Sequence, residues 1–332
     1  MDEPWWTTER RWYKEGMPQD MDWRDYFGTD KVVPVELFDS TPRFERKIIE
    51  ETDRYIIKQT AWGETEKAFK DLESTPEVLD YKIKERRDWL IAKARITYSE
   101  DRINWKWLKE NYEKYRANGY WMRQIFFFGF DLVHAHVLGS ETSLIALAEE
   151  PEWLQDIYET ISSLQLKMAE RVWEEGYRFD EVFWWDDMGY KGAPFFSAQT
   201  YRDTLKPFHK RLVDWAHDKG LPTQLHSCGN IMKLLPDIVD TGVDALNPLE
   251  VKAGMDGVQI KKDYGDKLIL RGGINAQWMH DLDRTIADIE KLVPILMKDG
   301  GYMFASDHTI PDDVSIDTMR KIIETVKRVG KY

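Results

Sequence analysis

The feature of this chain that most constrains its fold is a regular alternation of strand-like and helix-like segments through the C-terminal two thirds. Short apolar runs predict strands over residues 121–128, 181–185, 222–226, 243–247, 267–271 and 302–305. Amphipathic segments predict helices over residues 140–175, 201–219, 231–241, 257–264, 282–298 and 315–329. Strands and helices that alternate with short connections predict a parallel sheet covered by helices.

The number of these segments favours one α/β architecture. About eight strand–helix units fit a chain of 332 residues, which predicts a (β/α)8 TIM barrel rather than an open sheet. No Gly-x-Gly-x-x-Gly motif follows a strand and no Walker A loop occurs, so a dinucleotide-binding fold has no support. We expect one domain over residues 1–332, in which residues 1–50 form an N-terminal helical and loop elaboration near the barrel mouth.

The region upstream of the regular alternation is charged and aromatic. Residues 55–60 form a β-branched run that predicts a strand. Residues 69–98 read mostly as helix, whereas residues 23–28 read as loop. Several tryptophans lie in the first 30 residues, at positions 5, 6, 12 and 23. Their rings either form an apolar wall over the barrel mouth or pack in the core, and packing is the favoured interpretation.

Composition excludes several classes of protein. The 47 Lys+Arg against 60 Asp+Glu give a net charge of −13, which disfavours a nucleic-acid surface. No apolar run approaches the roughly 20 residues of a membrane span, and the N-terminus lacks the pattern of a signal peptide. We therefore expect a cytoplasmic protein without nucleic-acid or membrane partners. The single cysteine excludes an internal disulfide, a four-cysteine zinc site and a cysteine-held iron–sulfur cluster.

Polar side chains follow five consecutive predicted strands. They are Asp186 and Asp187; His226, Cys228 and Asn230; Asn247 and Glu250; Arg271 and Asn275; Asp307 and His308. The carboxyl ends of barrel strands meet at one face, where active sites of such barrels lie. Five strand ends that carry ionisable or amide groups predict a functional site on that face.

His226 and Cys228 have the spacing of a metal-binding pair. Side chains at i and i+2 of an extended segment point the same way, and imidazole and thiolate are both good zinc ligands. A third ligand would have to come from His308, Asp307, Glu250 or another acid close to the site. A buried cysteine that only fills space is the alternative interpretation of the pair.

Asp186 and Asp187 should point to opposite faces of their strand. One can bind a helix N-terminus while the other faces the pocket, and Asp187, nearer the loop, is favoured as the pocket residue. Structural roles are favoured for the histidines at positions 134 and 136. Those at positions 209, 217 and 280 lie on or beside predicted helices, where we expect them to be solvated.

Several of these motifs together resemble the uroporphyrinogen decarboxylase superfamily. They are Asp-Asp-Met-Gly-Tyr at 186–190, His-Ser-Cys-Gly-Asn at 226–230, Gly-Val-Asp-Ala-Leu-Asn-Pro-Leu-Glu at 242–250, Gly-Gly-Ile-Asn at 272–275 and Ser-Asp-His-Thr-Ile-Pro at 306–311. The resemblance extends from about residue 121 to residue 332. The resemblance implies a (β/α)8 barrel. The superfamily includes both cofactor-free decarboxylases and methyltransferases of corrinoid-dependent systems.

Two differences favour the methyltransferase branch. True decarboxylases carry an N-terminal Met-Arg-Gln-Ala-Gly-Arg segment for the acidic tetrapyrrole, and this chain has no match to it. The methyltransferases use a His-x-Cys pair and a later cysteine as zinc ligands. His226 and Cys228 match the pair, and His308 stands near the position of the missing cysteine. The resemblance thus implies zinc on His226, Cys228 and His308.

The resemblance implies zinc-assisted transfer of a methyl group between a corrinoid protein and either a thiol or a small methylated substrate, for example O-demethylation of a methoxylated compound. The expected catalytic residues are Asp186, Asp187, Tyr190 and Glu250, and the expected substrate-binding residues are Trp185, Asn247, Asn275 and Asp307. The alternatives are a cofactor-independent decarboxylase and a non-catalytic protein that binds a tetrapyrrole or corrinoid. Both a monomer and a homodimer are compatible with the resemblance.

Overall fold

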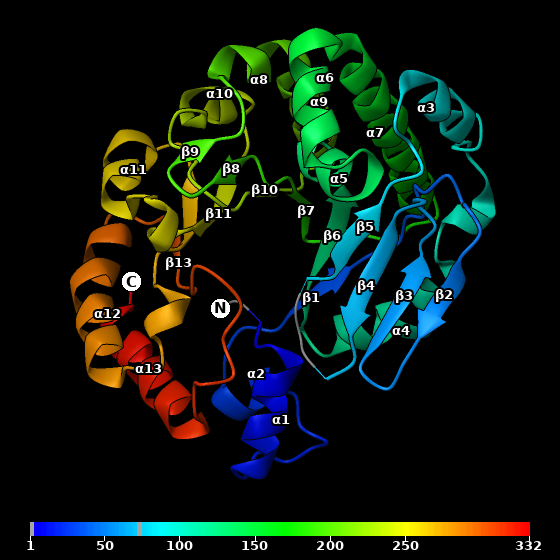
Figure 1. Cartoon of the computed structure of the whole chain (residues 1–332). Coiled ribbons are helices and arrows are strands. Elements are labelled where there is room, and N and C mark those ends of the chain that lie inside the picture. Colours follow the sequence, from blue (N-terminus) through cyan, green and yellow to red (C-terminus); the bar gives the residue numbers. More distant parts are fainter. Residues whose placement is uncertain (1–2, 72–74) are drawn as a thin grey trace. The chain divides into compact units, whose positions relative to one another are not determined.

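The computed structural model describes residues 3–71 and 75–332 (Figure 1). The chain forms two compact units. Unit 1 comprises Met1–Val33, Met188–Pro194 and Pro222–Tyr332, and unit 2 comprises Pro34–Asp187 and Phe195–Leu221. Each unit contributes alternating strands and helices, as the sequence pattern predicts.

The main sheet has seven strands. In sheet order they are β1 (Val32–Val35), β6 (Trp121–Phe127), β7 (Glu181–Trp185), β10 (Thr223–His226), β11 (Ala245–Leu249), β12 (Ile269–Gly272) and β13 (Tyr302–Met303). The pairs β6–β7, β10–β11, β11–β12 and β12–β13 run parallel. The α/β class and the parallel sheet are therefore confirmed.

The closed eight-stranded barrel is not confirmed. In the residues that the structure describes, the strand order is linear and ends at β1 and β13. The ladder at the second end is short, because β13 pairs through only two residues. Beyond it the chain continues as isolated bridges, between Ile274 and Ser306 and between Pro4 and Ile310.

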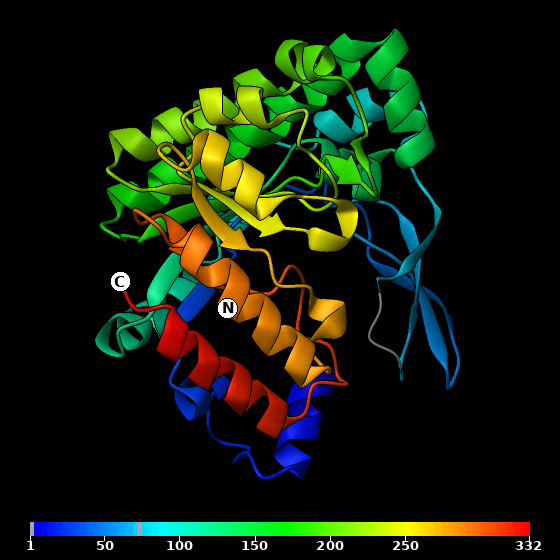
Figure 2. The ribbon, with the colours of Figure 1, turned by 90° about the vertical axis from the view of Figure 1, so that its left-hand side faces the viewer.

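The helices of the alternating region lie where the pattern predicts them. They are α6 (Ser140–Glu149), α7 (Pro151–Glu174), α8 (Ala198–Thr204), α9 (Lys206–Asp218), α10 (Leu235–Asp240), α11 (Gly257–Tyr264), α12 (Leu282–Leu296) and α13 (Ile316–Val329). Helix α7 buries the stripe Leu154, Ile157, Ile161, Leu164 and Met168. Helices α12 and α13 pack side by side (Figures 1 and 2). None of the described helices combines the length and apolarity needed to cross a membrane.

Upstream, the prediction of a mostly helical segment over residues 69–98 is wrong in its first part. A four-stranded antiparallel sheet is formed by β2 (Lys47–Glu51), β3 (Tyr55–Gln59), β4 (Thr65–Phe69) and β5 (Glu77–Asp80), and only α3 (Arg86–Lys93) is helical there (Figure 1). Residues 72–74 of that prediction lie outside the described residues. The strand predicted at 55–60 is confirmed as β3. Pairing between strands, such as Tyr55 opposite Phe69, overrides the local pattern.

Near the N-terminus, α1 (Trp6–Lys14) and α2 (Trp23–Phe27) are helices, so the loop predicted at 23–28 is wrong. Trp12 is fully buried, packs edge-on against Phe27 with ring centroids 5.2 Å apart, and donates its Nε1 hydrogen to the Val314 carbonyl. Trp23 is also buried. These two tryptophans are core residues. The remaining helices are α4 (Trp105–Ala117) and α5 (Phe130–Leu132).

Candidate active site

The strand ends of unit 1 are in register. His226, the last residue of β10, is opposite Asn247 on β11, and Leu249 is opposite Gly272 on β12. Side chains that follow these strands therefore leave the sheet at the same edge. This places the segments after His226, Leu249 and Gly272 next to one another, as the sequence predicts.

His226 and Cys228 approach each other. The Cys228 Sγ lies 3.3 Å from the His226 Nε2, and both residues are half-buried. Between them, Ser227 donates its N–H to the Asn247 carbonyl and accepts a hydrogen bond from the N–H of Met188 at 3.0 Å. The imidazole and the thiol thus lie on one side of a segment whose backbone is fixed to the neighbouring strand.

Asp187 joins this pair through the chain itself. It is bonded to Met188, whose N–H is held by Ser227, so its main chain is fixed beside the His226–Cys228 segment. One carboxylate oxygen of Asp187, one ring nitrogen of His226 and the Cys228 Sγ all lie within 4.8 Å of one another. This arrangement of an oxygen, a nitrogen and a sulfur donor can hold a metal ion. His308, the third ligand implied by the resemblance, is not in the group.

Gly229 allows the loop after Cys228 to form. Its φ is +81°, and a Cβ there would lie 2.1 Å from the carbonyl carbon of Gly189. Any other residue would therefore push the two backbones apart. Glu250, which is 8% exposed, accepts the Gly229 N–H with one oxygen and lies 3.3 Å from the Lys252 Nζ with the other. Glu250 braces the loop that carries Cys228.

Asp307 is fully buried and its carboxylate is used by the backbone. It accepts hydrogen bonds from the N–H groups of Ala276 at 2.8 Å and Val251 at 3.0 Å. Burial raises the pKa of this carboxyl group, and the two backbone hydrogen bonds oppose the rise. Asp307 therefore ties together the segments after three strands.

The other polar residues predicted for the site differ in their surroundings. The Asn275 Oδ1 accepts the Gln277 N–H and caps a short helix. The buried Oδ1 of Asn247 has no hydrogen-bond partner among the described residues. His308 lies near Trp5, with ring centroids 6.2 Å apart, and burial lowers its pKa. Tyr190 is 50% exposed.

Asp186 lies in unit 2 and is fully buried in a side-chain network. Its Oδ2 lies 2.9 Å from the Nε2 of His209, and the Nδ1 of His209 lies 2.9 Å from the Tyr201 Oη. Its Oδ1 accepts the Asp131 N–H at the start of α5. Burial raises the pKa of Asp186, and the hydrogen bond from His209 opposes the rise. Asp186 binds a helix N-terminus, one of the two roles predicted for the pair.

The expectation that His209 is solvated is wrong. His209 is fully buried on α9, between Asp186 and Tyr201. Its position at a buried helix face could have been inferred from the neighbours Leu212, Val213 and Ala216. Gly129 faces the same network, because a Cβ there would lie 2.4 Å from the Asp186 Oδ2.

Trp185, predicted to bind substrate, lines a cavity of about 400 Å³ in unit 2. Phe127, the last residue of β6, is opposite Trp185 in the sheet, and their rings meet edge-on with centroids 6.2 Å apart. Glu36, Phe38 and Asp131 complete the polar and aromatic lining. Glu36 and Phe38 are not among the predicted site residues, because the sequence pattern does not identify β1 as a strand.

The family described as uroporphyrinogen decarboxylase (URO-D) matches residues 133–329, which is more than half of the chain. The chain belongs to the uroporphyrinogen decarboxylase family. The match includes the segments that carry Asp187, His226, Cys228 and Glu250, whereas Glu36 and Phe127 of the cavity fall outside it.

This member of the uroporphyrinogen decarboxylase family also resembles a solved structure. The protein is a methyltransferase from Methanosarcina mazei, with a TM-score of 0.61 at 16% sequence identity, over 92% of this chain and 82% of that chain. At this identity the likeness shows the fold. None of the curated proteins matches the chain.

Proposed function

We propose that the protein is a methyltransferase that moves a methyl group between a corrinoid on a separate protein and either a thiol or a small methylated substrate, such as a methoxylated compound. The observation that carries this proposal is the approach of the Cys228 thiol to the His226 imidazole at a strand end, beside Asp187. Family membership and the fold shared with a methyltransferase support it.

The donor set fits zinc. Zinc in proteins takes sulfur, nitrogen and carboxylate oxygen ligands, and catalytic sites use three protein ligands and leave one position open. His226 and Cys228 would hold the ion, with Asp187 or His308 as the third ligand. When bound, zinc supplies Lewis acidity, which lowers the pKa of a thiol or polarises an ether oxygen.

The residues around the pair have supporting roles in this proposal. Glu250 orients the Cys228 loop through the Gly229 N–H. Asp187, if it is not a ligand, stabilises or protonates the oxygen that leaves when a methyl group is removed. Tyr190, which is 50% exposed, would orient a substrate. Both oxygens of Asp307 and the Oδ1 of Asn275 are engaged by backbone N–H groups.

The family description also favours a second candidate, a cofactor-independent decarboxylase. Its substrate would be a polycarboxylate, which a net charge of −13 repels unless local arginines offset it. A non-catalytic protein that binds a tetrapyrrole or corrinoid is the third candidate. The first candidate differs from the other two in requiring a metal.

Metal analysis of protein purified without chelator tests the proposal. We expect one zinc per chain in the native protein and in the control variant His280→Ala, because His280 is 52% exposed and pairs with Asp313. Zinc should be lost in Cys228→Ala and His226→Ala. Loss in only one of Asp187→Ala and His308→Ala identifies the third ligand. Metal-free protein that decarboxylates a porphyrinogen would overturn the proposal.

An activity assay completes the test. Methylated substrates are incubated with the native protein and a reduced corrinoid protein, and methylation of the corrinoid is followed by its absorption spectrum. We expect methyl transfer with the native protein. With Cys228→Ala we expect transfer to be at least about a hundredfold slower, because this variant removes a proposed metal ligand. A corrinoid that binds but is never methylated by any donor would favour the non-catalytic candidate.

A further inference from the structure

The cavity beside Trp185 is lined by both aromatic and acidic side chains. Three of its eight lining residues are aromatic, namely Phe38, Phe127 and Trp185, and two are acidic, namely Glu36 and Asp131. The other three are aliphatic or carry an amide, and neither lysine nor arginine lines the cavity. An aromatic cavity with carboxylates and without a positive side chain is suited to a positively charged ligand.

The aromatic walls are held in place by backbone and side-chain bonds. The Gln165 side chain accepts the Phe127 N–H, donates to the Phe127 carbonyl at 2.7 Å, and donates to the Ser40 Oγ at 2.8 Å. Leu37 accepts the Asn104 N–H, and Phe38 forms a bridge with Ile103. The segment after β1 and the end of β6 therefore present a preformed wall, so that a ligand does not have to order it.

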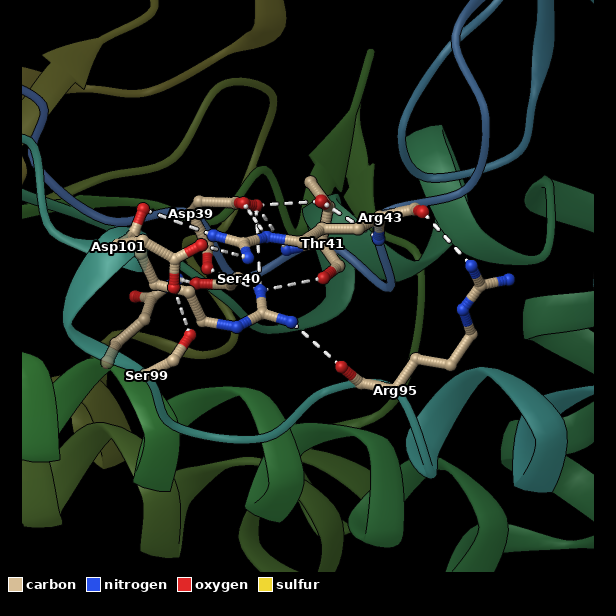
Figure 3. Close-up of polar contacts among 9 residues, drawn as sticks. Asp39, Ser40, Thr41, Arg43, Arg95, Ser99 and Asp101 are labelled. Atoms are coloured by element: carbon tan, nitrogen blue, oxygen red, sulfur yellow. Dashed lines mark hydrogen bonds and ion pairs between the residues drawn. The ribbon is translucent and has the colours of Figure 1, made fainter.

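Two arginines near this wall, Arg43 and Arg102, already have acceptors. Arg102, which is buried, donates to the carbonyl groups of Asp39, Thr41 and Arg95. Arg43 lies 2.7 Å from the Asp39 Oδ2 with its Nε and 2.7 Å from the Asp101 Oδ2 with its Nη1 (Figure 3). Their charges are directed to these groups rather than to the cavity.

The two carboxylates of the cavity are poorly compensated. Among the described residues, Glu36 has no hydrogen-bond or ion-pair partner. One oxygen of Asp131 lies 3.3 Å from the His134 Nε2, and its other oxygen has no partner in the described part of the chain. A cation in the cavity would therefore meet negative charge that the protein itself does not neutralise.

We propose that this cavity binds a quaternary ammonium group, for example the trimethylammonium head of a choline-like compound. The faces of aromatic rings attract weakly hydrated organic cations, and carboxylates at the rim add Coulombic attraction. A hard metal cation would need about six oxygen ligands, which this lining does not supply. A neutral aromatic ring would gain contact with the walls but nothing from Glu36 and Asp131.

This assignment rests on the proposed function. The quaternary ammonium compound is then the substrate, and it donates the methyl group. The nucleophilic acceptor, a reduced corrinoid or a thiolate, supplies the electron pair of the new bond to the methyl carbon. The C–N bond breaks and its electron pair stays on nitrogen. The amine leaves uncharged, so no proton has to be delivered to it.

Binding is tested by titration calorimetry of the full chain, without any corrinoid protein. The ligands are choline, its neutral isostere in which carbon replaces nitrogen (dimethylbutanol), and methoxybenzene. We expect choline to bind at least about tenfold tighter than the isostere, which corresponds to the charge-dependent part of the attraction. Methoxybenzene or the isostere binding as tightly as choline would overturn the inference.

Variants locate the binding. Glu36→Gln and Asp131→Asn should each weaken choline binding about threefold to tenfold, and Trp185→Leu by about tenfold or more. Glu110→Gln, an exposed acid on α4, is the control and should bind choline as the native protein does. Circular dichroism checks that each variant is folded. Choline affinity unchanged in the three cavity variants would place binding elsewhere and overturn the inference.

The two proposals fail separately. If methyl transfer from another donor is observed but choline does not bind, the proposed function stands and this inference fails. If choline binds in the cavity but neither a corrinoid nor a thiol is ever methylated, the cavity is a binding site for the cation and the proposed function fails.

Discussion

The strand ends of the two units are held in different ways. In unit 2, Asp186 is fixed by a buried chain of side chains, through His209 to Tyr201. In unit 1, Asp307 and Glu250 are fixed by backbone N–H groups, those of Ala276, Val251 and Gly229. The first arrangement depends on a pair of side chains, and the second on the course of the backbone.

The two regions should therefore tolerate different substitutions. Removing one member of a buried side-chain pair leaves the other uncompensated. A backbone N–H, in contrast, can donate to any acceptor oxygen in a similar position, so an amide can replace a carboxylate at lower cost. Unit 2 should therefore be sensitive to the loss of a side chain, and unit 1 to changes of backbone conformation.

The largest expected effect is in unit 2. Asp186→Ala leaves the Nε2 of buried His209 without its carboxylate partner and the Asp131 N–H without an acceptor, and should lower the free energy of unfolding by about 3–5 kcal/mol. Urea unfolding followed by circular dichroism measures it. Asp53→Ala, at an exposed turn, is the control and should change stability by less than about 0.5 kcal/mol.

The double variant Asp186→Ala with His209→Ala tests whether these two side chains stabilise the protein as a unit. If the two side chains form a unit, the double variant should lose less stability than the two single variants together. Additive losses would show that the network does not act as a pair, and the contrast between the two units would then fail.

In unit 1, the backbone substitution should have the greater effect. Gly229→Ala places a Cβ against Gly189 in a left-handed conformation, and should cost about 2–4 kcal/mol through strain and overpacking. Thermal and urea unfolding measure the loss. Gly220→Ala is a matched control, because it also has a positive φ but nothing lies within 4 Å of its Cβ position. An equal loss in both would assign the effect to the backbone angle alone.

Asp307→Asn should be milder than Asp186→Ala. The amide oxygen still accepts one backbone N–H, so we expect a loss of about 1–3 kcal/mol for the other. The same urea unfolding experiment gives the value. A loss larger than that of Asp186→Ala would contradict the idea that backbone-held acids tolerate an isosteric amide.

The smallest expected effect is a pH dependence in the segment that follows β1. Burial would raise the pKa of Asp39, but hydrogen bonds from Thr41 and Arg43 and the charge of Arg102 hold it below its usual value (Figure 3). A carboxyl group with a lowered pKa adds stability above its unfolded-state pKa of about 3.9, and this stability is lost as the pH falls through the folded-state value.

Acid unfolding of Asp39→Asn tests this sign. The difference in stability between the native protein and the variant should be constant near neutral pH and shrink below about pH 4. A difference that grows as the pH falls would contradict the lowered pKa. Because Asp39 is partly exposed, we expect the effect to be the smallest of the series.

Local pattern predicted much of the fold and part of the site. The positions of β6, β7 and β10 to β13, and of the helices between them, follow from apolar periodicity, which reflects which face each segment buries. The approach of His226 to Cys228 follows from the alternation of side chains along a strand. The same alternation predicts that Asp186 and Asp187 point to opposite faces, and Asp186 binds a helix N-terminus.

Other features depended on contacts between distant segments. The antiparallel sheet β2 to β5 has largely exposed or half-buried side chains, so its strands carry no strong periodicity. The burial of His209 depends on Asp186, which lies 23 residues away in the chain. Glu36 and Phe38 become cavity residues only because Arg102 and Asn104 fix the segment around them.

By itself, the sequence determined the alternation of parallel strands and helices, the family motifs and a set of polar strand ends. Periodicity and covalent spacing are properties of residues that are close in the chain, so they do not depend on the folded structure. Only the tertiary structure decided which acids hold neighbouring backbone segments, as Asp307 and Glu250 do. That choice depends on burial and on hydrogen-bond partners from distant segments, which local spacing does not specify.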